Sequence, residues 1–422
     1  MTDLKRSLLK RLCKANLQDS EPRFAERVLA RALSVDVCWV EPAAPHAAAQ
    51  INSVRRSTDS VVAQPKALGS NQKLHAKVTP AQNGMIFKNV SIWPDSSFLK
   101  RGRAVFAPTH ASVPMDDVLW RNSASCVWDL PGVAAVSMPR AKRIEKGICL
   151  FGHGAANWYH WLIEILPMGL RATTLEKEFA QYPLLVPQHA LDIASFRDGL
   201  EVFREGREIV ALHEGARYDI GDLVVLPQSA SGPVNLVPGR WPKPEHYSQD
   251  VGHMRQFRKR LLERLLDNGA AQDLPKRVFL MRRTDRRNYN QTEVLEAAET
   301  FGFVPVRPET LSLSRQIALF HNAECVVGMT GAAWAGALFM QPGAKALVWM
   351  PEEFTGGCFF SNLAHISGAD MSYRFTRSQP PATSTEQIHF QDTVIPKQGV
   401  TRDLEAILAD TASQSEPKAA SV

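Results

Sequence analysis

The chain has 422 residues, of which 45% are hydrophobic and 22% are charged, and its formal net charge is +6. This composition is that of a soluble globular protein, and the length exceeds one ordinary domain, so we expect two domains. The basic residues are scattered and are not interleaved with aromatic ones. This argues against a nucleic-acid partner, whereas an acidic ligand or a membrane surface would explain the positive charge.

The six cysteines lie far apart, and no Cys-x-x-Cys pair occurs. Their spacing therefore predicts neither a zinc site nor a redox pair. No secretory signal is recognisable at the N-terminus, so we expect a cytoplasmic protein.

Residues 1–40 are expected to form an N-terminal helical segment, because leucines recur there at helical spacing among lysines and arginines. Such a basic amphipathic helix either lies peripherally on an anionic surface, here the inner membrane, or packs on its own domain or on a partner. Residues 41–82, rich in Ala, Pro, Ser and Gln, are expected to be an irregular connection. Residues 83–226 are then expected to form an α/β domain, β-rich up to about residue 137.

The most informative part of this domain follows the apolar run 148–151, which predicts a strand. A loose turn containing His153 leads to Asn157, a good N-cap for a helix in which Asn157, His160 and Glu164 share one stripe. A carboxylate one turn from an imidazole orients it and raises its basicity, as a general base requires. The alternative is a solvated helical ion pair. Pro167 is expected to kink or end the helix.

The rest of the chain continues the α/β pattern. Strands are expected at 183–187, 208–212 and 223–226, with a helix at 192–203. Residues 227–246 contain Pro and Ser and are expected to be a linker. A C-terminal domain is expected over 247–410, beginning with a helix, and residues 411–422 are expected to be a disordered tail.

The stretch from Arg277 to Pro351 organises the C-terminal domain. An apolar run from Arg277 predicts a buried strand that stops at Arg282 and Arg283, and residues 324–351 predict a strand, a small-residue turn, a helix and another strand. Strands alternating with helices predict a parallel sheet, in which ligands bind beyond the carboxyl ends of the strands. Residues 325–344 carry no charge and are long enough to span a bilayer, but their glycines favour a buried α/β core.

The turn Thr330-Gly331-Ala332-Ala333 and the arginine pair suit a diphosphate. The small residues let a ligand approach the backbone, a helix beginning there directs free N–H groups at it, and guanidinium groups match phosphate oxygens. The alternative is that the small residues serve packing and the arginines are solvated. Since adjacent residues of a strand point to opposite faces, one arginine should matter more, and Arg283, further past the strand end, is expected to be that one.

A set of short motifs, in this order and spacing, resembles glycosyltransferase family 61, the capsular-polysaccharide-type transferases. The N-terminal element is the block from Asn157 to Pro167, which resembles the family's Asn-Tyr-Tyr-His-Trp-Leu block. The C-terminal elements are Arg282-Arg-Thr-Asp285, Asn290-x-x-Glu293, Phe301-Gly-Phe303, Pro308-Glu-x-Leu-Ser312, Gln316-x-x-Leu-Phe320, Val326-Val-Gly328, Gly331-Ala332, Leu338-Phe339 and Pro342-Gly343.

The resemblance implies a GT-B fold, with two Rossmann-like domains facing each other across a cleft. It implies an inverting transfer of a sugar from a nucleotide sugar, expected to be UDP-linked, to a saccharide acceptor in capsular, exo- or lipopolysaccharide synthesis. The donor would lie on Arg282, Arg283 and Thr330 to Ala333, and the acceptor near His153 and Asn157. His160 with Glu164 would be the base, with His153 and Asp285 as rivals. The alternative is a catalytically silent relative that acts as a binding or assembly subunit.

No metal or other cofactor is expected, because no Asp-x-Asp pair occurs to hold a divalent ion and the arginines can neutralise the leaving diphosphate. The chain also departs from the family pattern. Thr330 stands where the family has His, Ala333 where it has Gly, and Met281 where it has Ser. Gly336 replaces an Asn, and Val348 replaces a Glu, which puts ribose or sugar recognition in doubt unless Glu352 or Glu353 substitutes.

Overall fold

The computed structural model divides the chain into two compact units, which are described separately below. Unit 1 consists of Met1–Asp59 and Val78–Val237, and unit 2 of Ser60–Lys77 and Pro238–Val422. The structure describes residues 7–10, 24–55, 58–79, 82–108, 125–130, 132–233, 236–266, 269, 271–283, 289–377, 380–388 and 391–412. Asp285 and most of the expected C-terminal tail lie outside these residues.

Unit 2 is built on a five-stranded sheet in the order β17-β16-β18-β19-β20, and every neighbouring pair is parallel. The alternation of strands and helices predicted this, and the buried strands are continuous apolar runs, as in parallel sheets covered on both faces. The strands are β16 (Arg277–Leu280), β17 (Val304–Val306), β18 (Cys325–Met329), β19 (Lys345–Pro351) and β20 (Asp370–Thr376).

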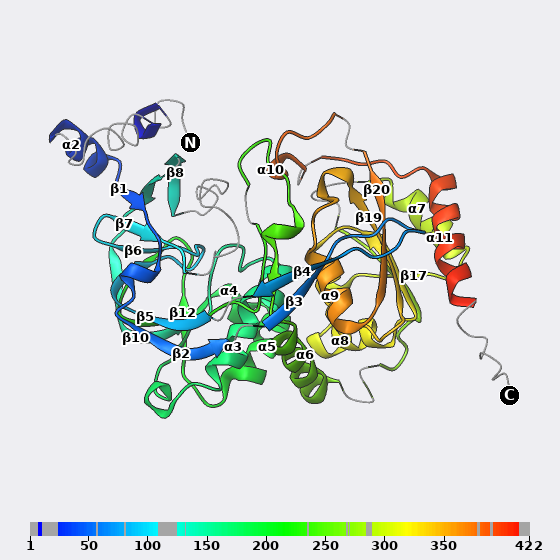
Figure 1. Cartoon of the computed structure of the whole chain (residues 1–422), viewed down its shortest axis with the longest axis horizontal. Coiled ribbons are helices and arrows are strands. Elements are labelled where there is room, and N and C mark those ends of the chain that lie inside the picture. Colours follow the sequence, from blue (N-terminus) through cyan, green and yellow to red (C-terminus); the bar gives the residue numbers. More distant parts are fainter. Residues whose placement is uncertain are drawn as a thin grey trace. The chain divides into compact units, whose positions relative to one another are not determined.

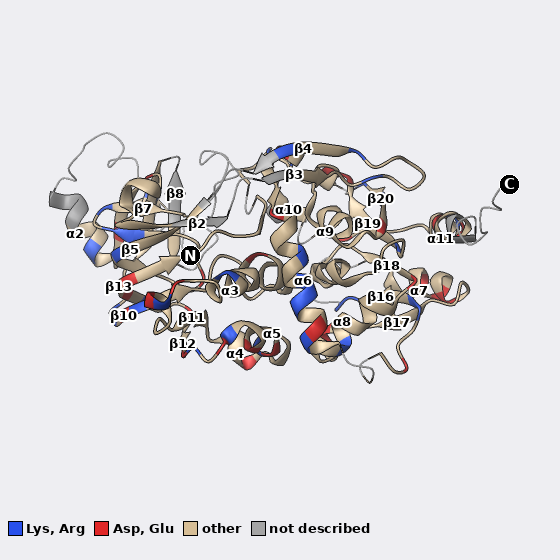
Figure 2. Cartoon of the chain, turned by 60° about the horizontal axis from the view of Figure 1, so that its bottom comes forward, with Lys and Arg blue, Asp and Glu red and all other residues tan. Residues whose placement is uncertain are grey.

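Helices cover both faces of this sheet, as Figure 2 shows: α6, α8 and α9 lie on one side and α7 and α11 on the other. The helices are α6 (Val251–Leu265), α7 (Gln291–Glu299), α8 (Leu313–Asn322), α9 (Phe359–Ser367), α10 (Thr385–Ile388) and α11 (Lys397–Ala412). Short 3-10 helices are η5 (Pro244–His246), η6 (Pro308–Thr310), η7 (Ala332–Phe339) and η8 (Glu352–Phe354), and β15 is Ser248–Gln249.

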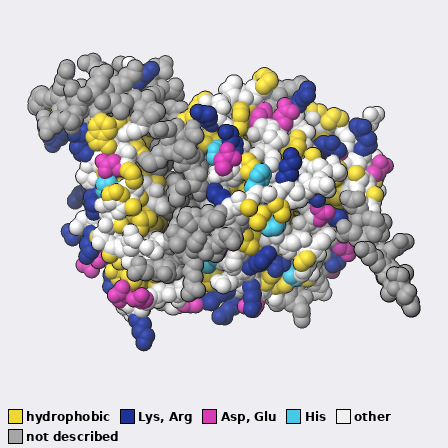
Figure 3. All heavy atoms as spheres, in the orientation of Figure 1, with side chains coloured by type: hydrophobic (Ala, Val, Ile, Leu, Met, Phe, Trp, Pro, Cys, Tyr) yellow, Lys and Arg dark blue, Asp and Glu magenta, His cyan; other side chains and the backbone are white. Residues whose placement is uncertain are grey.

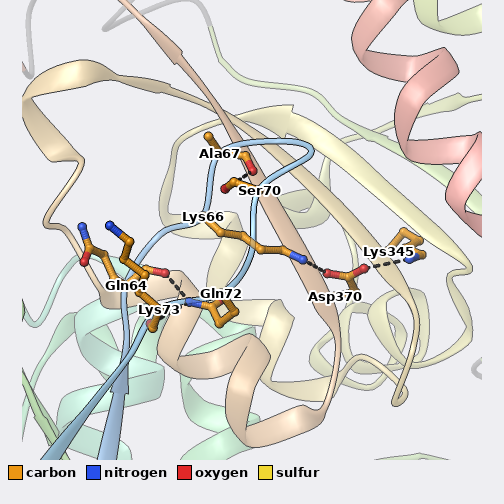
Figure 4. A network of polar contacts seen from close by, with 8 residues as sticks. All are labelled: Gln64, Lys66, Ala67, Ser70, Gln72, Lys73, Lys345 and Asp370. Carbon is orange, nitrogen blue, oxygen red and sulfur yellow. Dashed lines mark hydrogen bonds and ion pairs between the residues drawn. The ribbon is translucent and has the colours of Figure 1, made fainter.

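An arm from the N-terminal half of the sequence, residues 60–77, belongs to unit 2 (Figure 1). It contains most of a two-stranded sheet, β3 (Thr58–Ala63) and β4 (Leu74–Thr79). Between these strands, Ala67 pairs with Tyr373 in parallel and so extends the sheet beyond β20. Figure 4 shows Asp370 accepting hydrogen bonds from Lys66 of the arm and from Lys345, whose Nζ lies 2.7 Å from Oδ2. This partly buried ion network fixes the arm to the amino edge of the sheet.

Unit 1 contains an eleven-stranded mixed sheet, in the order β12-β11-β10-β13-β5-β6-β7-β1-β9-β8, with β2 also paired to β5. The segment β12-β11-β10-β13 is parallel throughout, and β7 and β1 also pair in parallel. The strands are β1 (Val35–Val40), β2 (Ala49–Arg55), β5 (Gln82–Ile92), β6 (Leu99–Arg101), β7 (Ala104–Phe106), β8 (Cys126–Leu130), β9 (Val133–Ser137), β10 (Ala141–Cys149), β11 (Leu184–Pro187), β12 (Ile209–Leu212) and β13 (Arg217–Val225); β14 is Ala230–Ser231.

Within the parallel segment of unit 1, helices connect β10 to β11 and β11 to β12. The helical elements are α2 (Phe24–Ala32), η1 (Ala44–His46), η3 (His160–Ile165), α3 (Leu166–Ala172), η4 (Lys177–Phe179), α4 (His189–Asp192) and α5 (Ala194–Arg204). A core of buried Phe, Val, Ile and Leu side chains, including Phe87, Phe106 and Leu223, lies against this sheet. The fold is thus mixed α/β, and unit 1 carries more antiparallel sheet than a Rossmann-like domain.

Two sequence-based expectations need correction, and a third is narrowed. The N-terminal helical segment ends at Ala32, because Val35–Val40 forms β1 of the large sheet. Residues 41–82 are not an irregular connection but contain three strands: β3 and β4 pair with each other, and β2 pairs with β5, so pairing overrides a composition rich in Ala, Pro, Ser and Gln. Of the two alternatives for Pro167, a kink or an end of the helix, the end is excluded, because the helix continues as α3 to Ala172.

The uncharged stretch 325–344 forms β18, the following turn and η7, as the buried α/β interpretation predicted. No helix composed of described residues is long and apolar enough to cross a membrane. On the face shown in Figure 3, the coloured basic side chains are distributed among acidic and apolar ones.

Candidate active site

The sheet of unit 2 has a topological switch point between β16 and β18. From β16 the chain moves outward to β17, and it then returns to the other side of β16 to form β18, β19 and β20. In open α/β sheets, ligands bind at such points, beyond the carboxyl ends of the strands. Arg282 follows β16 and Thr330 follows β18, so the topology brings the two predicted motifs to this one place.

Arg282 contacts the small-residue turn directly. Its Nη1 donates to the backbone oxygen of Thr330 at 2.9 Å. Its Nε would lie 3.8 Å from a Cβ placed on Gly331, so the guanidinium group lies beside the Thr330–Gly331 peptide. Arg283 is exposed, whereas Arg282 is half-buried. The geometry therefore favours Arg282 over Arg283 as the arginine of this site, in contrast to the sequence-based preference.

The turn also presents backbone donors. The N–H of Thr330 is used by the sheet, since it donates to the oxygen of Trp349 at 2.8 Å. For the N–H groups of Gly331, Ala332 and Ala333, the described part of the chain supplies no hydrogen-bond partner. These residues are half-buried and begin η7, a 3-10 helix of eight residues. Three consecutive free donors beside a guanidinium group form a site suited to an anion.

Buried contacts of η7 hold the backbone of this turn in place. Trp334 is fully buried, and its Nε1 donates to the oxygen of Met329 at 3.2 Å. Gly336 lies against α8, where an added Cβ would be 2.1 Å from Cε2 of Phe320. The family's Asn at this position would therefore require Phe320 to move, so glycine here is explained by close packing of η7 on α8.

The position of the family Glu in β19 is buried, whereas two glutamates follow the end of this strand. Val348, which stands in the place of a family Glu, is fully buried and paired within the sheet to Tyr373. Glu352 and Glu353 follow the carboxyl end of β19 in η8, and Glu352 lies 3.6 Å from Nε of Arg377. Both residues thus lie beyond the carboxyl end of β19, and their part in sugar recognition stays a prediction.

Unit 1 has its own switch point, at β10. The chain moves from β10 to β11 and β12 on one side and then forms β13 on the other. The segment after β10 carries His153, Asn157 and His160. Asn157 caps the helix as predicted, because its Oδ1 accepts the N–H of Tyr159 at 2.9 Å.

The helix is not a regular α-helix at the predicted site. Residues His160–Ile165 form a π-helical segment, which continues into α3. Such segments are rare and occur frequently at functional sites. Pro167 lies two residues beyond this segment and has no N–H to donate to the preceding turn. The helix departs from regular α-helical geometry in the turn that precedes this proline.

His160 and Glu164 form a close pair, with Nδ1 and Oε2 2.7 Å apart. The exposed fraction of the side chain is 26% for His160 and 10% for Glu164, so the alternative of a solvated ion pair does not hold. Burial lowers the pKa of His160, but the charge of Glu164 and its hydrogen bond raise it, and the net shift is upward. The predicted pair is therefore present, and its role as a base stays a prediction.

Gly154 supports the imidazole of His160 from the turn. Its φ is +73°, a conformation that favours glycine, and an added Cβ would lie 2.7 Å from Cδ2 of His160. The neighbouring His153 donates its backbone N–H to Oγ of Ser97 at 2.9 Å, which connects the turn to the loop between β5 and β6. Sequence reasoning missed Gly154 and Ser97; only the glycine in Gly-His-Gly offered a signal, and it does not indicate a contact with His160.

No group of three or more His, Cys, Asp or Glu side chains is arranged to hold a metal ion among the residues that the structure describes. Asp285, the third catalytic candidate, lies outside those residues. Whether catalysis requires a metal therefore stays a prediction.

Comparison with protein families connects the two halves of the candidate site. The family model described as Glycosyltransferase 61 matches residues 158–347. The matched range contains His160 and Glu164 in unit 1 and Arg282 and the turn after β18 in unit 2. It begins after His153 and Asn157. No curated protein was found to match the chain.

Proposed function

We propose, from the premise that residues 158–347 belong to glycosyltransferase family 61, that the protein transfers a sugar from a nucleoside diphosphate to a hydroxyl group of a saccharide. Unit 2 would bind the donor, and unit 1 would bind the acceptor and supply the base. The proposal includes the GT-B arrangement, inversion at the anomeric carbon and a place in capsular, exo- or lipopolysaccharide synthesis, as the resemblance implies. The observation that carries it is the contact of Arg282 with the turn at the switch point.

The leaving group would be stabilised by unit 2. When the bond between the anomeric carbon and the phosphate oxygen breaks, negative charge grows on the diphosphate. In this proposal the guanidinium group of Arg282 and the N–H groups of Gly331 to Ala333 would face the diphosphate as that charge develops. Donors fixed before the reaction need no reorganisation during it, which is why such preorganised groups are effective.

The base would be His160. The carboxylate of Glu164 can only accept a hydrogen bond, so Nδ1 of His160 carries the proton in their 2.7 Å contact. In the neutral imidazole, Nε2 is then the acceptor, and the described residues provide no partner for it. It could take the proton of the acceptor hydroxyl as the oxygen attacks the anomeric carbon. Asp285 and His153 are the other candidates for this role.

A binding panel tests the donor half of the proposal. Thermal unfolding would be measured with UDP-, GDP- and CMP-sugars, with the free nucleosides as controls. A ligand at about 100 times its dissociation constant stabilises the folded state by about 2.7 kcal/mol. We expect at least one nucleoside diphosphate sugar, UDP-linked in the first instance, to stabilise the protein and its nucleoside not to do so.

Transfer to saccharide acceptors would then be assayed with the bound donor, with and without EDTA. We expect activity in EDTA, because the donor site is supplied with protein cations and N–H groups. Donor binding without transfer to any acceptor would favour the catalytically silent relative. If no nucleotide sugar binds, the proposed function is wrong. Contact of the basic N-terminal helix with an anionic membrane is a separate proposal, which vesicle flotation of the full chain would test.

A further inference from the structure

Gln291, the first residue of α7, contacts both backbone groups of Arg282. Its Oε1 accepts the Arg282 N–H at 2.7 Å, and its Nε2 donates to the Arg282 oxygen at 3.2 Å. The sheet no longer holds the chain here. Met281, the residue after β16, still bonds the neighbouring strand, through its N–H to the oxygen of Val306 at 2.9 Å. The carboxamide of Gln291, which has the donor and acceptor of a peptide group, therefore takes the place of a strand partner.

Tyr289 fixes the orientation of this carboxamide. The hydroxyl of Tyr289 donates to the same Oε1 at 3.1 Å. Two donors thus meet the oxygen, and the amide group meets a carbonyl oxygen, so the reversed orientation would place donors against donors. Burial raises the pKa of Tyr289 and the charge of Arg282 lowers it, with a net upward shift, so the hydroxyl keeps its proton at neutral pH.

This clamp determines where the Arg282 side chain begins. With the backbone of Arg282 held at two points, its Nη1 reaches the oxygen of Thr330 at 2.9 Å and the guanidinium group lies beside Gly331. We propose that Gln291 is a positioning residue, which holds the guanidinium group of Arg282 at the anion site before a nucleoside diphosphate binds. The inference rests on the proposed function, in which Arg282 contacts that diphosphate.

The expected effect follows from the cost of ordering a flexible side chain on binding. Without Gln291, the Arg282 side chain would become ordered only when the ligand binds, and the lost entropy would reduce the affinity. Gln291→Ala should therefore weaken binding of uridine diphosphate by about 2- to 10-fold. The effect should disappear when Arg282 is already replaced by alanine, because the clamp then has no guanidinium group to hold. A residue that served the fold alone would give the same loss with or without Arg282.

The experiment is calorimetric titration of uridine diphosphate into the full chain and its Gln291→Ala, Arg282→Ala and doubly substituted variants, with pyrophosphate as a second probe. Asn290→Ala is the matched control. Asn290 contacts Glu293 and both backbone groups of Ile395 but no part of Arg282, so it should lower stability and leave affinity unchanged. Thermal unfolding of each variant would verify folding.

The outcomes separate the inference from the proposed function. Additive losses in the double variant, or no loss in Gln291→Ala while Arg282→Ala loses affinity, would overturn the positioning role and leave the donor site intact. Unchanged affinity in Arg282→Ala would overturn the donor site and the role of Gln291 with it. Loss of affinity in Asn290→Ala equal to that in Gln291→Ala would show that any disturbance of α7 acts on binding, and would also overturn the inference.

Discussion

Gly154→Ala tests the role of His160 without removing its imidazole. Placed on the present backbone, the new Cβ would lie 2.7 Å from Cδ2, 3.1 Å from Cγ and 3.3 Å from Nε2 of His160. The ring would have to shift, and it is held by its hydrogen bond to Glu164. A shift of about 1 Å in a reacting group can lower turnover on the order of 10²-fold. We expect that loss in the turnover number, with affinity for uridine diphosphate unchanged.

A matched control separates two costs of Gly154→Ala, the strain in the backbone and the loss of the contact between His160 and Glu164. Gly215 has φ +71°, close to the +73° of Gly154, but an added Cβ there meets nothing within 4 Å. Alanine in this left-handed conformation costs about 1–2 kcal/mol in either position. Gly154→Ala should also weaken the charge-assisted hydrogen bond of His160, which contributes about 1.5–3 kcal/mol. Gly215→Ala should therefore show the smaller loss in urea unfolding and near-normal turnover.

The assay is transfer with the donor identified by the binding panel, at saturating donor and acceptor, beside urea unfolding of both variants. If Gly154→Ala keeps the turnover of Gly215→Ala, the position of the imidazole is not important for the reaction. The base would then have to be sought at His153 or Asp285.

Three further predictions follow from the described contacts. His160→Ala should lower the turnover number by about 10²- to 10⁴-fold with little change in donor affinity. In the unsubstituted protein, kcat/KM should rise with pH through a midpoint above 6.5, because the base must be neutral and the pKa of His160 is raised. Glu164→Gln should lower the midpoint of that pH profile, because it removes the charge that raises this pKa. Arg282→Ala should weaken binding of uridine diphosphate by about 10- to 150-fold, with partial recovery in Arg282→Lys, whereas Arg283→Ala should cost about 5-fold or less in the same titration. Burial raises the pKa of Asp370, but its two lysine partners lower it, and the net shift is downward from 3.8. The ionised Asp370 therefore stabilises the fold above pH 3.8, and this stabilisation is lost as the pH falls through the lowered pKa. Asp370→Asn should thus narrow the difference in unfolding free energy between pH 7 and pH 3.

The sheet of unit 2 was predictable because its strands are short apolar runs separated by helices. The strand order was not, since pairing partners far apart in sequence leave no local signal. The same reason hid the arm, whose residue Ala67 pairs with Tyr373. Local patterning gave the contact of His160 with Glu164, because i, i+4 spacing brings side chains together in most helical geometries.

Other features of the site depend on contacts that spacing cannot supply. The π-helical segment depends on packing around a helix that is buried on nearly every side. The preference for Arg283 assumed that the residue further along the chain reaches the ligand more easily. The contact of Gln291 with the backbone of Arg282, nine residues earlier, lay outside that assumption. A glutamine in the first turn of a helix has many uses, so its identity alone does not indicate that contact.

The arm of unit 2 has a consequence for biosynthesis. Lys66 is made 304 residues before Asp370, its partner in the sheet edge. At about 5–20 residues per second, a ribosome needs roughly 15–60 s to cover that distance. During this interval the arm cannot be paired with β20, and unit 2 can complete its edge only after almost the whole chain has been made. A fragment that starts at Pro238 would lack the arm altogether and would expose the backbone of β20, which is the kind of unpaired strand that associates with other chains.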